Sequence, residues 1–294
     1  MREPHPNASL PTHSAARSRG MRQDITSLTM KSTDPGQYAS VNGLQLYYEV
    51  HGVPHGKVPL VLLHGGVGGI AMFGPNLGTL AQGRRIIAVE LQGHGRTADI
   101  DRPIRYEHMA DDIAALLASL EIERADIMGY SLGGGVALQT AIRHPEKVRR
   151  LVVVSRQFKS SGFFPDLQAA FEHMGPETGA PLEHSPLAQM YPRVNWRTLF
   201  AKIGEMERAK YDWSADVAKL SMPVLLVFAD ADSITPAHMI EFWQLLGGGL
   251  RDAGLDGSLR PAGRELAVVP GTTHYNVLAT DAVARLAIPF LDSP

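Results

Sequence analysis

Short apolar runs alternate with helical patterns along most of this 294-residue chain. Four of these runs have the length and composition of strands buried on both faces of a parallel sheet, and they lie at residues 59–65, 84–91, 125–131 and 148–155. Residues 106–122 place a row of apolar side chains on one face of a helix: Met109, Ile113, Leu116, Leu117 and Leu120. The alternation predicts an α/β fold with a mostly parallel central sheet, right-handed crossovers and helices on both faces.

The same alternation of apolar runs and helical patterns occurs again near the carboxyl end of the sequence. Before the first buried run, residues 38–52 read as two alternating runs joined by Asn42-Gly43, a dipeptide favoured in tight hairpin turns. Late apolar runs at 222–232 and 264–274 are each followed by a helical pattern. We therefore expect four regions: a disordered tail at 1–33, the first part of the core at 34–155, an inserted lid at 156–215 and the second part of the core at 216–294.

The alternation of strand and helix patterns is interrupted at residues 156–215, which predicts a helical lid inserted between two strands. The segment has no clear strand pattern and holds nine of the twenty aromatic residues. Its apolar underside would line a substrate pocket, although these aromatic residues could instead only pack on the main domain. We expect the pocket to include five lid side chains and two neighbours of the central motifs, which are Phe158, Phe163, Phe164, Met190, Trp196, Tyr130 and Tyr275.

Residues 127–138 read IMGYSLGGGVAL and place Ser131 between a predicted strand and a predicted helix. Gly129 and Gly133, two positions to either side, permit a sharp turn that holds the serine in a strained conformation above the sheet. The N–H groups at the start of the following helix favour negative charge near this serine. We interpret Ser131 as a nucleophile; the alternative is a glycine-rich turn with an incidental serine.

A nucleophilic serine needs a base and an acid that orients the base. Asp232 lies just beyond the predicted strand at 222–232, and His274 lies in the loop after the next one. The carboxyl ends of parallel strands gather at one edge of the sheet, so we expect Ser131, Asp232 and His274 to form a catalytic triad. Asp230 is the rival acid, with a turn or helix cap as its alternative role.

An oxyanion hole requires N–H donors beside the serine. We assign one to the backbone of Leu132 and one to the loop HGGVGG, with Gly66 as first choice and Val67 as second. Glycine permits the backbone to approach the substrate closely. We expect His64 to brace this loop by hydrogen bonding.

The charge balance argues for a small-molecule partner. With 28 basic and 30 acidic residues the formal charge is −2, which does not suggest binding to nucleic acid or to a membrane surface. The absence of cysteine excludes a thiol nucleophile, disulfides and thiolate metal sites. We find neither a run of about 18 apolar residues nor a secretory signal, and expect a soluble, cytoplasmic protein; the oligomeric state stays open.

Five motifs resemble the α/β-hydrolase family over residues 38–290. In order, they are HGG at 64–66, GHGRT at 93–97, GYSLG at 129–133, ADADSITP at 229–236 and GTTH at 271–274. The chain has Glu90, Thr97 and Ala229 where family members usually have Asp, Ser and Gly. The resemblance implies an α/β-hydrolase fold and a serine hydrolase that uses neither metal nor cofactor, with an acyl-enzyme formed at Ser131 and hydrolysed by water activated through His274.

The family contains several chemistries that the motifs do not separate. Dehalogenases and epoxide hydrolases use aspartate at the elbow, so Ser131 argues against them, whereas carbon–carbon bond hydrolases, perhydrolases and lactonases also use serine. The stretches ELQGHGRTADIDRP and GYSLGGGVAL more loosely resemble serine-dependent macrolide esterases and the esterases of resistance cassettes. We therefore expect an ester or lactone hydrolase, with a macrolide as one candidate substrate; a small-molecule receptor or carrier is the non-enzymatic alternative.

Overall fold

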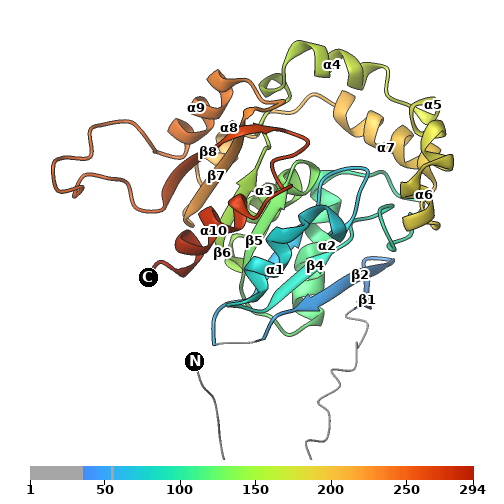
Figure 1. Cartoon of the computed structure of the whole chain (residues 1–294), viewed down its shortest axis with the longest axis horizontal. Coiled ribbons are helices and arrows are strands. Elements are labelled where there is room, and N and C mark those ends of the chain that lie inside the picture. The colour runs from blue at the N-terminus through green and yellow to red at the C-terminus, as the bar shows by residue number, and fades with distance from the viewer. Residues whose placement is uncertain (1–35, 54–55) are drawn as a thin grey trace, which may run out of the picture. The chain divides into compact units, whose positions relative to one another are not determined.

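The computed structural model describes residues 36–53 and 56–294, so the tail expected at 1–33 lies outside the described residues. Eight strands of the described part form one sheet in the order β1-β2-β4-β3-β5-β6-β7-β8 (Figure 1). Their bounds are Gly36–Val41 (β1), Leu44–His51 (β2), Leu60–Leu63 (β3), Ile86–Val89 (β4), Ala125–Tyr130 (β5), Val148–Val154 (β6), Val224–Ala231 (β7) and Arg264–Thr273 (β8).

Parallel pairing dominates the sheet. β1 and β2 form the antiparallel hairpin expected around Asn42-Gly43, and β2 also runs antiparallel to β4. From β4 through β3, β5, β6 and β7 to β8, neighbouring strands are parallel. The α/β fold with a mostly parallel sheet is thereby confirmed, and the carboxyl ends of β5, β7 and β8 lie at the same edge.

Helices fill the connections between the strands. The α-helices span Pro75–Ala81 (α1), Tyr106–Ser119 (α2), Leu132–Arg143 (α3), Pro165–Glu172 (α4), Pro176–Gly179 (α5), Pro186–Met190 (α6), Trp196–Arg208 (α7), Ser214–Val217 (α8), Pro236–Leu245 (α9) and Ala282–Asp292 (α10). Short 3-10 helices span Ile70–Phe73, Pro145–Lys147, Ser160–Gly162 and Ala180–His184. Within the described ranges, no helix is both long and apolar enough to span a membrane.

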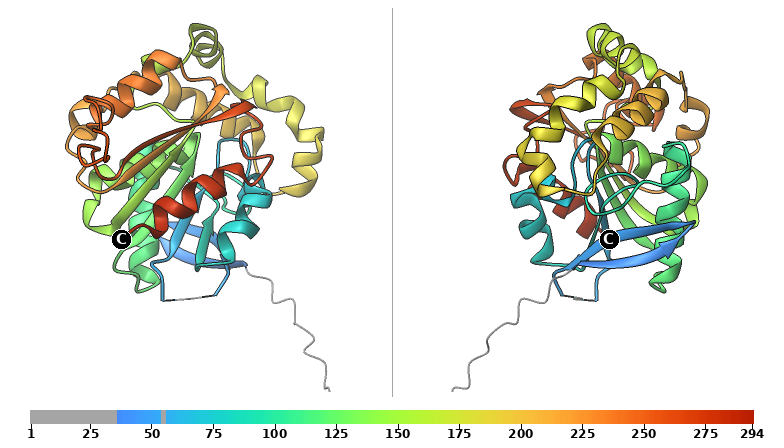
Figure 2. Two further views of the ribbon diagram at one scale, coloured as in Figure 1. Left: turned by 60° about the vertical axis from the view of Figure 1, so that its left-hand side comes forward. Right: turned by 90° about the vertical axis from the view of Figure 1, so that its right-hand side faces the viewer.

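Strand side chains alternate between two cores, one on each face of the sheet. In β3, Val61 and Leu63 enter the core covered by α2 and α3, whereas Leu60 and Leu62 enter the core covered by α1 and α10 (Figure 2). All four side chains are fully buried. Burial of a side chain of this size contributes about 1.5–3 kcal/mol to the free energy of unfolding. A strand with two apolar faces is therefore stable only where helices cover both faces of the sheet.

Helices α4 to α7 lie between β6 and β7 in the sequence and are grouped at one end of the sheet (Figure 1). The chain enters and leaves this segment at adjacent points. An antiparallel bridge joins Lys159 to Asp212, and the Trp213 N–H donates to the Phe158 carbonyl over 3.0 Å. These contacts hold the two ends of the inserted segment together.

Glycine is required where α3 meets the strands. A Cβ atom on Gly129 would lie 2.0 Å from the Gly133 carbonyl oxygen, and one on Gly133 would lie 2.2 Å from the Leu63 carbonyl oxygen. Both distances are far below van der Waals contact, and both obstacles are backbone atoms. The two glycines of the GYSLG motif therefore allow the first turn of α3 to lie directly against β3 and β5.

We predict that Gly133→Ala lowers the free energy of unfolding by about 1–3 kcal/mol, because the added methyl group forces backbone atoms apart. The matched control is Gly78→Ala on α1, where an added Cβ meets nothing within 4 Å. That control is expected to raise the free energy of unfolding by about 0.5–1 kcal/mol, since alanine is the better helix former. Urea unfolding measures the free energy of unfolding of both variants. Equal changes in the two variants would contradict the close contact between Gly133 and the backbone of β3.

Candidate active site

Ser131 stands at the turn between β5 and α3 with φ 52° and ψ −116°. A positive φ is uncommon for a residue with a side chain, and such strain is stored mainly at functional sites. The Ser131 N–H donates to the Val154 carbonyl over 2.9 Å, which ties the turn to the neighbouring strand β6. This bond holds the strained backbone in place, and Ser131 lines a cavity.

The structure brings Ser131, His274 and Asp232 together in one chain of hydrogen bonds. The distance from Ser131 Oγ to His274 Nε2 is 3.0 Å, and that from His274 Nδ1 to Asp232 Oδ1 is 2.8 Å. An ionised carboxylate only accepts, so Nδ1 carries the proton and Nε2 is free to accept from the serine hydroxyl. The arrangement can therefore deprotonate the serine and hold the resulting imidazolium.

The Asp232 carboxylate is buried among donors that keep it charged. Its Oδ2 accepts from Ser155 Oγ at 2.5 Å and from the Ala229 N–H at 3.0 Å. Burial raises the pKa of this carboxyl, but the hydrogen bonds from His274, Ser155 and Ala229 outweigh burial and hold the pKa below its usual value. A charged Asp232 is the form that orients the imidazole.

Asp230, the rival acid, faces elsewhere. Its carboxylate accepts hydrogen bonds from the N–H groups of Gly271 at 2.8 Å and Thr272 at 3.0 Å. These bonds join β7 to β8 where their register shifts, so Asp230 forms neither the triad contact nor the turn or helix cap considered as its alternative.

Two hydroxyl groups that sequence reasoning missed support the triad. Ser155 follows β6 with φ 50° and donates to Asp232, as described above. Tyr130, considered only as a pocket residue, donates its hydroxyl to the His274 carbonyl over 2.6 Å. The position of Ser155 at the carboxyl end of a predicted central strand was the signal that could have identified it.

The residues proposed for the oxyanion hole lie beside the serine. Gly66, Val67 and Leu132 all line the same cavity as Ser131. A Cβ on Gly66 would lie 3.8 Å from the Leu132 Cβ, so the two backbones are close, and Val67 has φ 64°, a strained value for a β-branched residue. No acceptor in the described part of the chain receives a hydrogen bond from the Leu132 or Val67 N–H.

Two buried side chains hold the loop that carries Gly66 and Val67. His64 Nδ1 lies 2.7 Å from the Gly65 carbonyl and its Nε2 accepts from the Leu91 N–H at 3.1 Å. Burial, with His94 alongside, lowers the pKa of His64 to about 3, so this ring is neutral and can brace the loop as expected. Glu90 accepts from the Ile70 N–H at 3.3 Å and from the Arg96 N–H at 2.5 Å, which links the same loop to the GHGRT segment.

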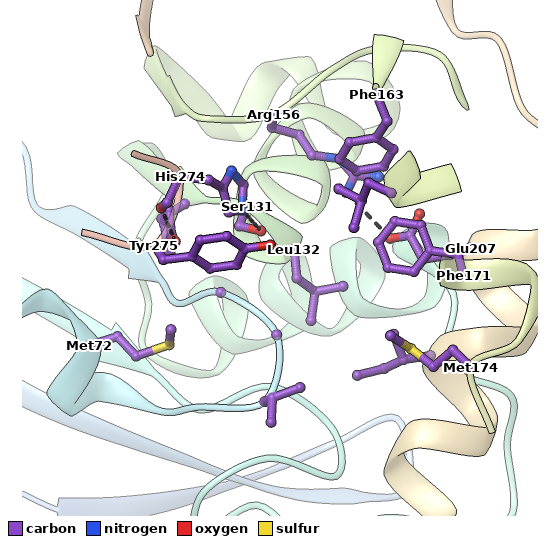
Figure 3. Close-up of a pocket in the computed structure, with 16 residues that line it drawn as sticks. Met72, Ser131, Leu132, Arg156, Phe163, Phe171, Met174, Glu207, His274 and Tyr275 are labelled. Atoms are coloured by element: carbon purple, nitrogen blue, oxygen red, sulfur yellow. Dashed lines mark hydrogen bonds and ion pairs between the residues drawn. The ribbon is translucent and has the colours of Figure 1, made fainter. Parts of the chain in front are cut away.

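The cavity above Ser131 has a volume of about 240 Å³ and a mainly apolar wall (Figure 3). Of the seven side chains expected there, Tyr130, Phe163 and Tyr275 line it. The segment between β6 and β7 also contributes residues not predicted from the sequence, which are Arg156, Leu167, Phe171, Met174, Ile203 and Glu207, and Met72 comes from the 3-10 helix Ile70–Phe73.

Four expected pocket residues lie elsewhere, which corrects the prediction. Phe158 and Trp196 are buried, and Phe158 packs on His238 and Phe242 with ring centroids 4.4 and 5.0 Å away. Phe164 and Met190 are 43% and 57% exposed and do not line the cavity. An apolar side chain in a lid can face the cavity, the core or solvent, and composition alone does not distinguish these directions.

Within residues 36–53 and 56–294, no group of three or more histidine, cysteine, aspartate or glutamate residues is placed to hold a metal ion. The polar side chains that line the cavity are Ser131, His274, Tyr130, Tyr275, Arg156 and Glu207.

Comparison with known proteins agrees with the fold and with hydrolytic chemistry. The family model for the alpha/beta hydrolase fold matches residues 58–176. A protein of Variovorax paradoxus named "Putative carbamate hydrolase RutD" is 30% identical over 278 residues, covering 84% of this chain and 98% of that protein. A 2-hydroxymuconate semialdehyde hydrolase of a Pseudomonas species is 42% identical over 100 residues, which are 33% of this chain and 35% of that enzyme.

Solved structures show the same fold. The enol-lactonase of Burkholderia xenovorans has a TM-score of 0.66 at 23% identity, covering 87% of this chain and all (100%) of that chain. A meta-cleavage product hydrolase of Pseudomonas fluorescens has a TM-score of 0.67 at 20% identity, covering 88% of this chain and 98% of that chain. These structures agree in fold, and the likeness to the Variovorax protein over 84% of this chain establishes that the chain belongs to the α/β-hydrolase family.

Proposed function

We propose that this protein is a serine hydrolase that cleaves a carboxylic ester or lactone of a small molecule through an acyl-enzyme at Ser131. The observation that carries the proposal is the unbroken chain of hydrogen bonds from Ser131 to His274 to Asp232 at the wall of a cavity. A hydroxyl is a weak nucleophile, and this arrangement is the known way to activate it.

The reaction proceeds in two halves. Ser131 Oγ attacks the carbonyl carbon while His274 Nε2 takes its proton, and the N–H groups of Leu132 and of Gly66 or Val67 stabilise the oxyanion. The bond from the carbonyl carbon to the leaving oxygen then breaks, and that oxygen takes the proton from His274. Water then attacks the acyl carbon and gives a proton to His274. The bond from that carbon to Ser131 Oγ breaks, Oγ takes the proton from His274, and the acid is released.

The cavity favours a small substrate. Its volume of about 240 Å³ lies below the roughly 300–1,000 Å³ of pockets that take drug-sized ligands. A macrocyclic lactone would exceed it, and the relatives described above are not named for macrolides. We therefore place small esters and lactones first among the candidate substrates.

The similarity to a 2-hydroxymuconate semialdehyde hydrolase over 100 residues favours carbon–carbon bond hydrolysis as a second candidate. The printed name of the Variovorax relative adds a carbamate as a third type of carbonyl substrate. All three reactions begin with attack on a carbonyl, so the same triad would serve them.

We predict that Ser131→Ala abolishes turnover, with a loss of roughly 10⁴-fold or more in kcat. Wild type and variant are incubated with aryl esters, lactones, a carbamate, a diketone and a macrolide, and mass spectrometry follows a gain of one water or the separated products. Circular dichroism verifies that the variant is folded. Turnover that persists in the folded variant would refute the role of Ser131, and ligand binding without product in wild type would favour a receptor or carrier.

We predict that the rate of ester hydrolysis falls with decreasing pH, because the proposed base is an imidazole, which accepts the serine proton only in its neutral form. Asp232, whose pKa is held below its usual value, keeps its charge at mildly acidic pH and does not cause the loss. A pH-rate profile of kcat/KM checks this, and a flat profile would contradict the assignment of His274.

A further inference from the structure

One pair of opposite charges lines the mainly apolar cavity. Arg156 follows β6 on the core, and Glu207 lies in the last turn of lid helix α7; Nη1 of Arg156 lies 3.4 Å from Oε1 of Glu207. Their side chains are only 2% and 6% exposed. Neither residue belongs to the catalytic triad, and a buried pair of this kind is weak evidence for stability on its own.

Most hydrogen-bonding atoms of Arg156 and Glu207 have partners within the protein. The Tyr106 hydroxyl donates to Oε1 of Glu207, so Oε1 receives two donors. Nη2 of Arg156 donates to the Tyr211 hydroxyl at 2.5 Å, and the guanidinium lies 4.5 Å from the centroid of the Tyr106 ring. Burial opposes the charge, but Tyr106, Tyr211 and Glu207 together raise the pKa of Arg156 above its usual value, so it remains a cation.

The second oxygen of Glu207 has no such partner. Among the described residues, none donates a hydrogen bond to Oε2, and this oxygen is not one of the fully enclosed polar atoms without a partner. Glu207 lines the cavity, and Figure 3 shows its carboxylate on the side of the pocket away from Ser131 and His274, with Leu132 between them. Oε2 therefore remains accessible from the cavity.

A substrate that fills the cavity would cover this oxygen. An apolar group placed there would leave a charged acceptor without a hydrogen bond, which is strongly unfavourable in a site of low polarity. A carboxylate would be repelled by Glu207, while both terminal nitrogens of Arg156 already have acceptors in the protein. A neutral hydroxyl or amide N–H group satisfies Oε2 without adding charge.

We propose that Glu207 determines substrate specificity by accepting a hydrogen bond, through Oε2, from a neutral hydroxyl or N–H group on the part of the substrate distant from the scissile bond. This inference rests on the proposed ester hydrolysis at Ser131. Arg156 and Tyr106 act as positioning residues that hold the carboxylate in place.

The test uses pairs of esters that differ only in the donor. Methyl ω-hydroxyalkanoates of increasing chain length are each compared with the methyl ester in which a methyl group replaces the hydroxyl, and ω-hydroxyalkyl acetates are compared with alkyl acetates in the same way. At the chain length that reaches Oε2, wild type is expected to prefer the hydroxy ester by roughly 10-fold to 100-fold in kcat/KM. The monomethyl ester of the dicarboxylic acid of matching length is expected to be a poorer substrate than the hydroxy ester.

Three variants distinguish a role of Glu207 in substrate recognition from a role in maintaining the fold. Glu207→Gln keeps the shape but removes the charge, and is expected to reduce the preference severalfold. The double change Arg156→Leu with Glu207→Leu removes both buried charges together, which proteins often tolerate, and is expected to abolish the preference. Glu205→Gln, on the same helix with a side chain 55% exposed, is the matched control and should keep the wild-type ratio.

The readout is the ratio of kcat/KM for the two esters of a pair, because a merely structural role would lower both values and leave their ratio unchanged. No preference for the hydroxy ester at any length, a preference that persists in the double variant, or a preference for the carboxylate ester would overturn the inference. If wild type hydrolyses none of the esters, the proposed ester hydrolysis fails instead, so the two failures are distinguishable.

Discussion

The close contact between the first turn of α3 and the backbones of β3 and β5 is the constraint on which the site depends. It is possible only because Gly129 and Gly133 carry no Cβ atom, since either added atom would lie within 2.2 Å of a carbonyl oxygen. The contact fixes the strained conformation of Ser131 and brings Leu132 next to Gly66. The nucleophile and the candidate oxyanion donors therefore derive their positions from one packing arrangement rather than from separate loops.

Burial of charge is the second requirement, and the chain meets it in two ways. Asp232 is held as an anion by hydrogen bonds from an imidazole, a hydroxyl and a backbone N–H. Arg156 and Glu207 are held as a pair with two tyrosines around them. Within the part of the chain that the structure describes, Asp232 does not line the cavity, whereas Glu207 does and leaves one carboxylate oxygen without a partner, which is why we assign recognition to Glu207.

The sheet and the elbow could be predicted because local patterns determine them. Buried parallel strands need continuous apolar runs, and the elbow needs glycine at fixed positions, so both are visible in the sequence. Asp232 and His274 were predictable as candidates because they follow strands whose carboxyl ends meet, and the structure places both within hydrogen-bonding distance of each other.

The lid was less predictable, because its side chains can turn in several directions. Phe163 faces the cavity, whereas its neighbour Phe164 is exposed, and nothing in their identical chemistry separates them. Ser155 and Glu207 were missed for a related reason. Each matters through a partner far away in the sequence, Asp232 for Ser155 and Arg156 for Glu207. The end of a predicted strand marked Ser155 as a candidate, but neither pairing can be read before the chain is folded.

Because the two ends of the inserted segment are joined, the helices between them can change in evolution independently of the residues of the proposed triad. The chain leaves the core after β6 and returns beside the same point, where Lys159 pairs with Asp212. The intervening helices can therefore differ in length without changing where the chain leaves and rejoins the sheet. Because Ser131, Asp232 and His274 all lie outside this segment, such changes would reshape the cavity wall and leave the proposed triad in place.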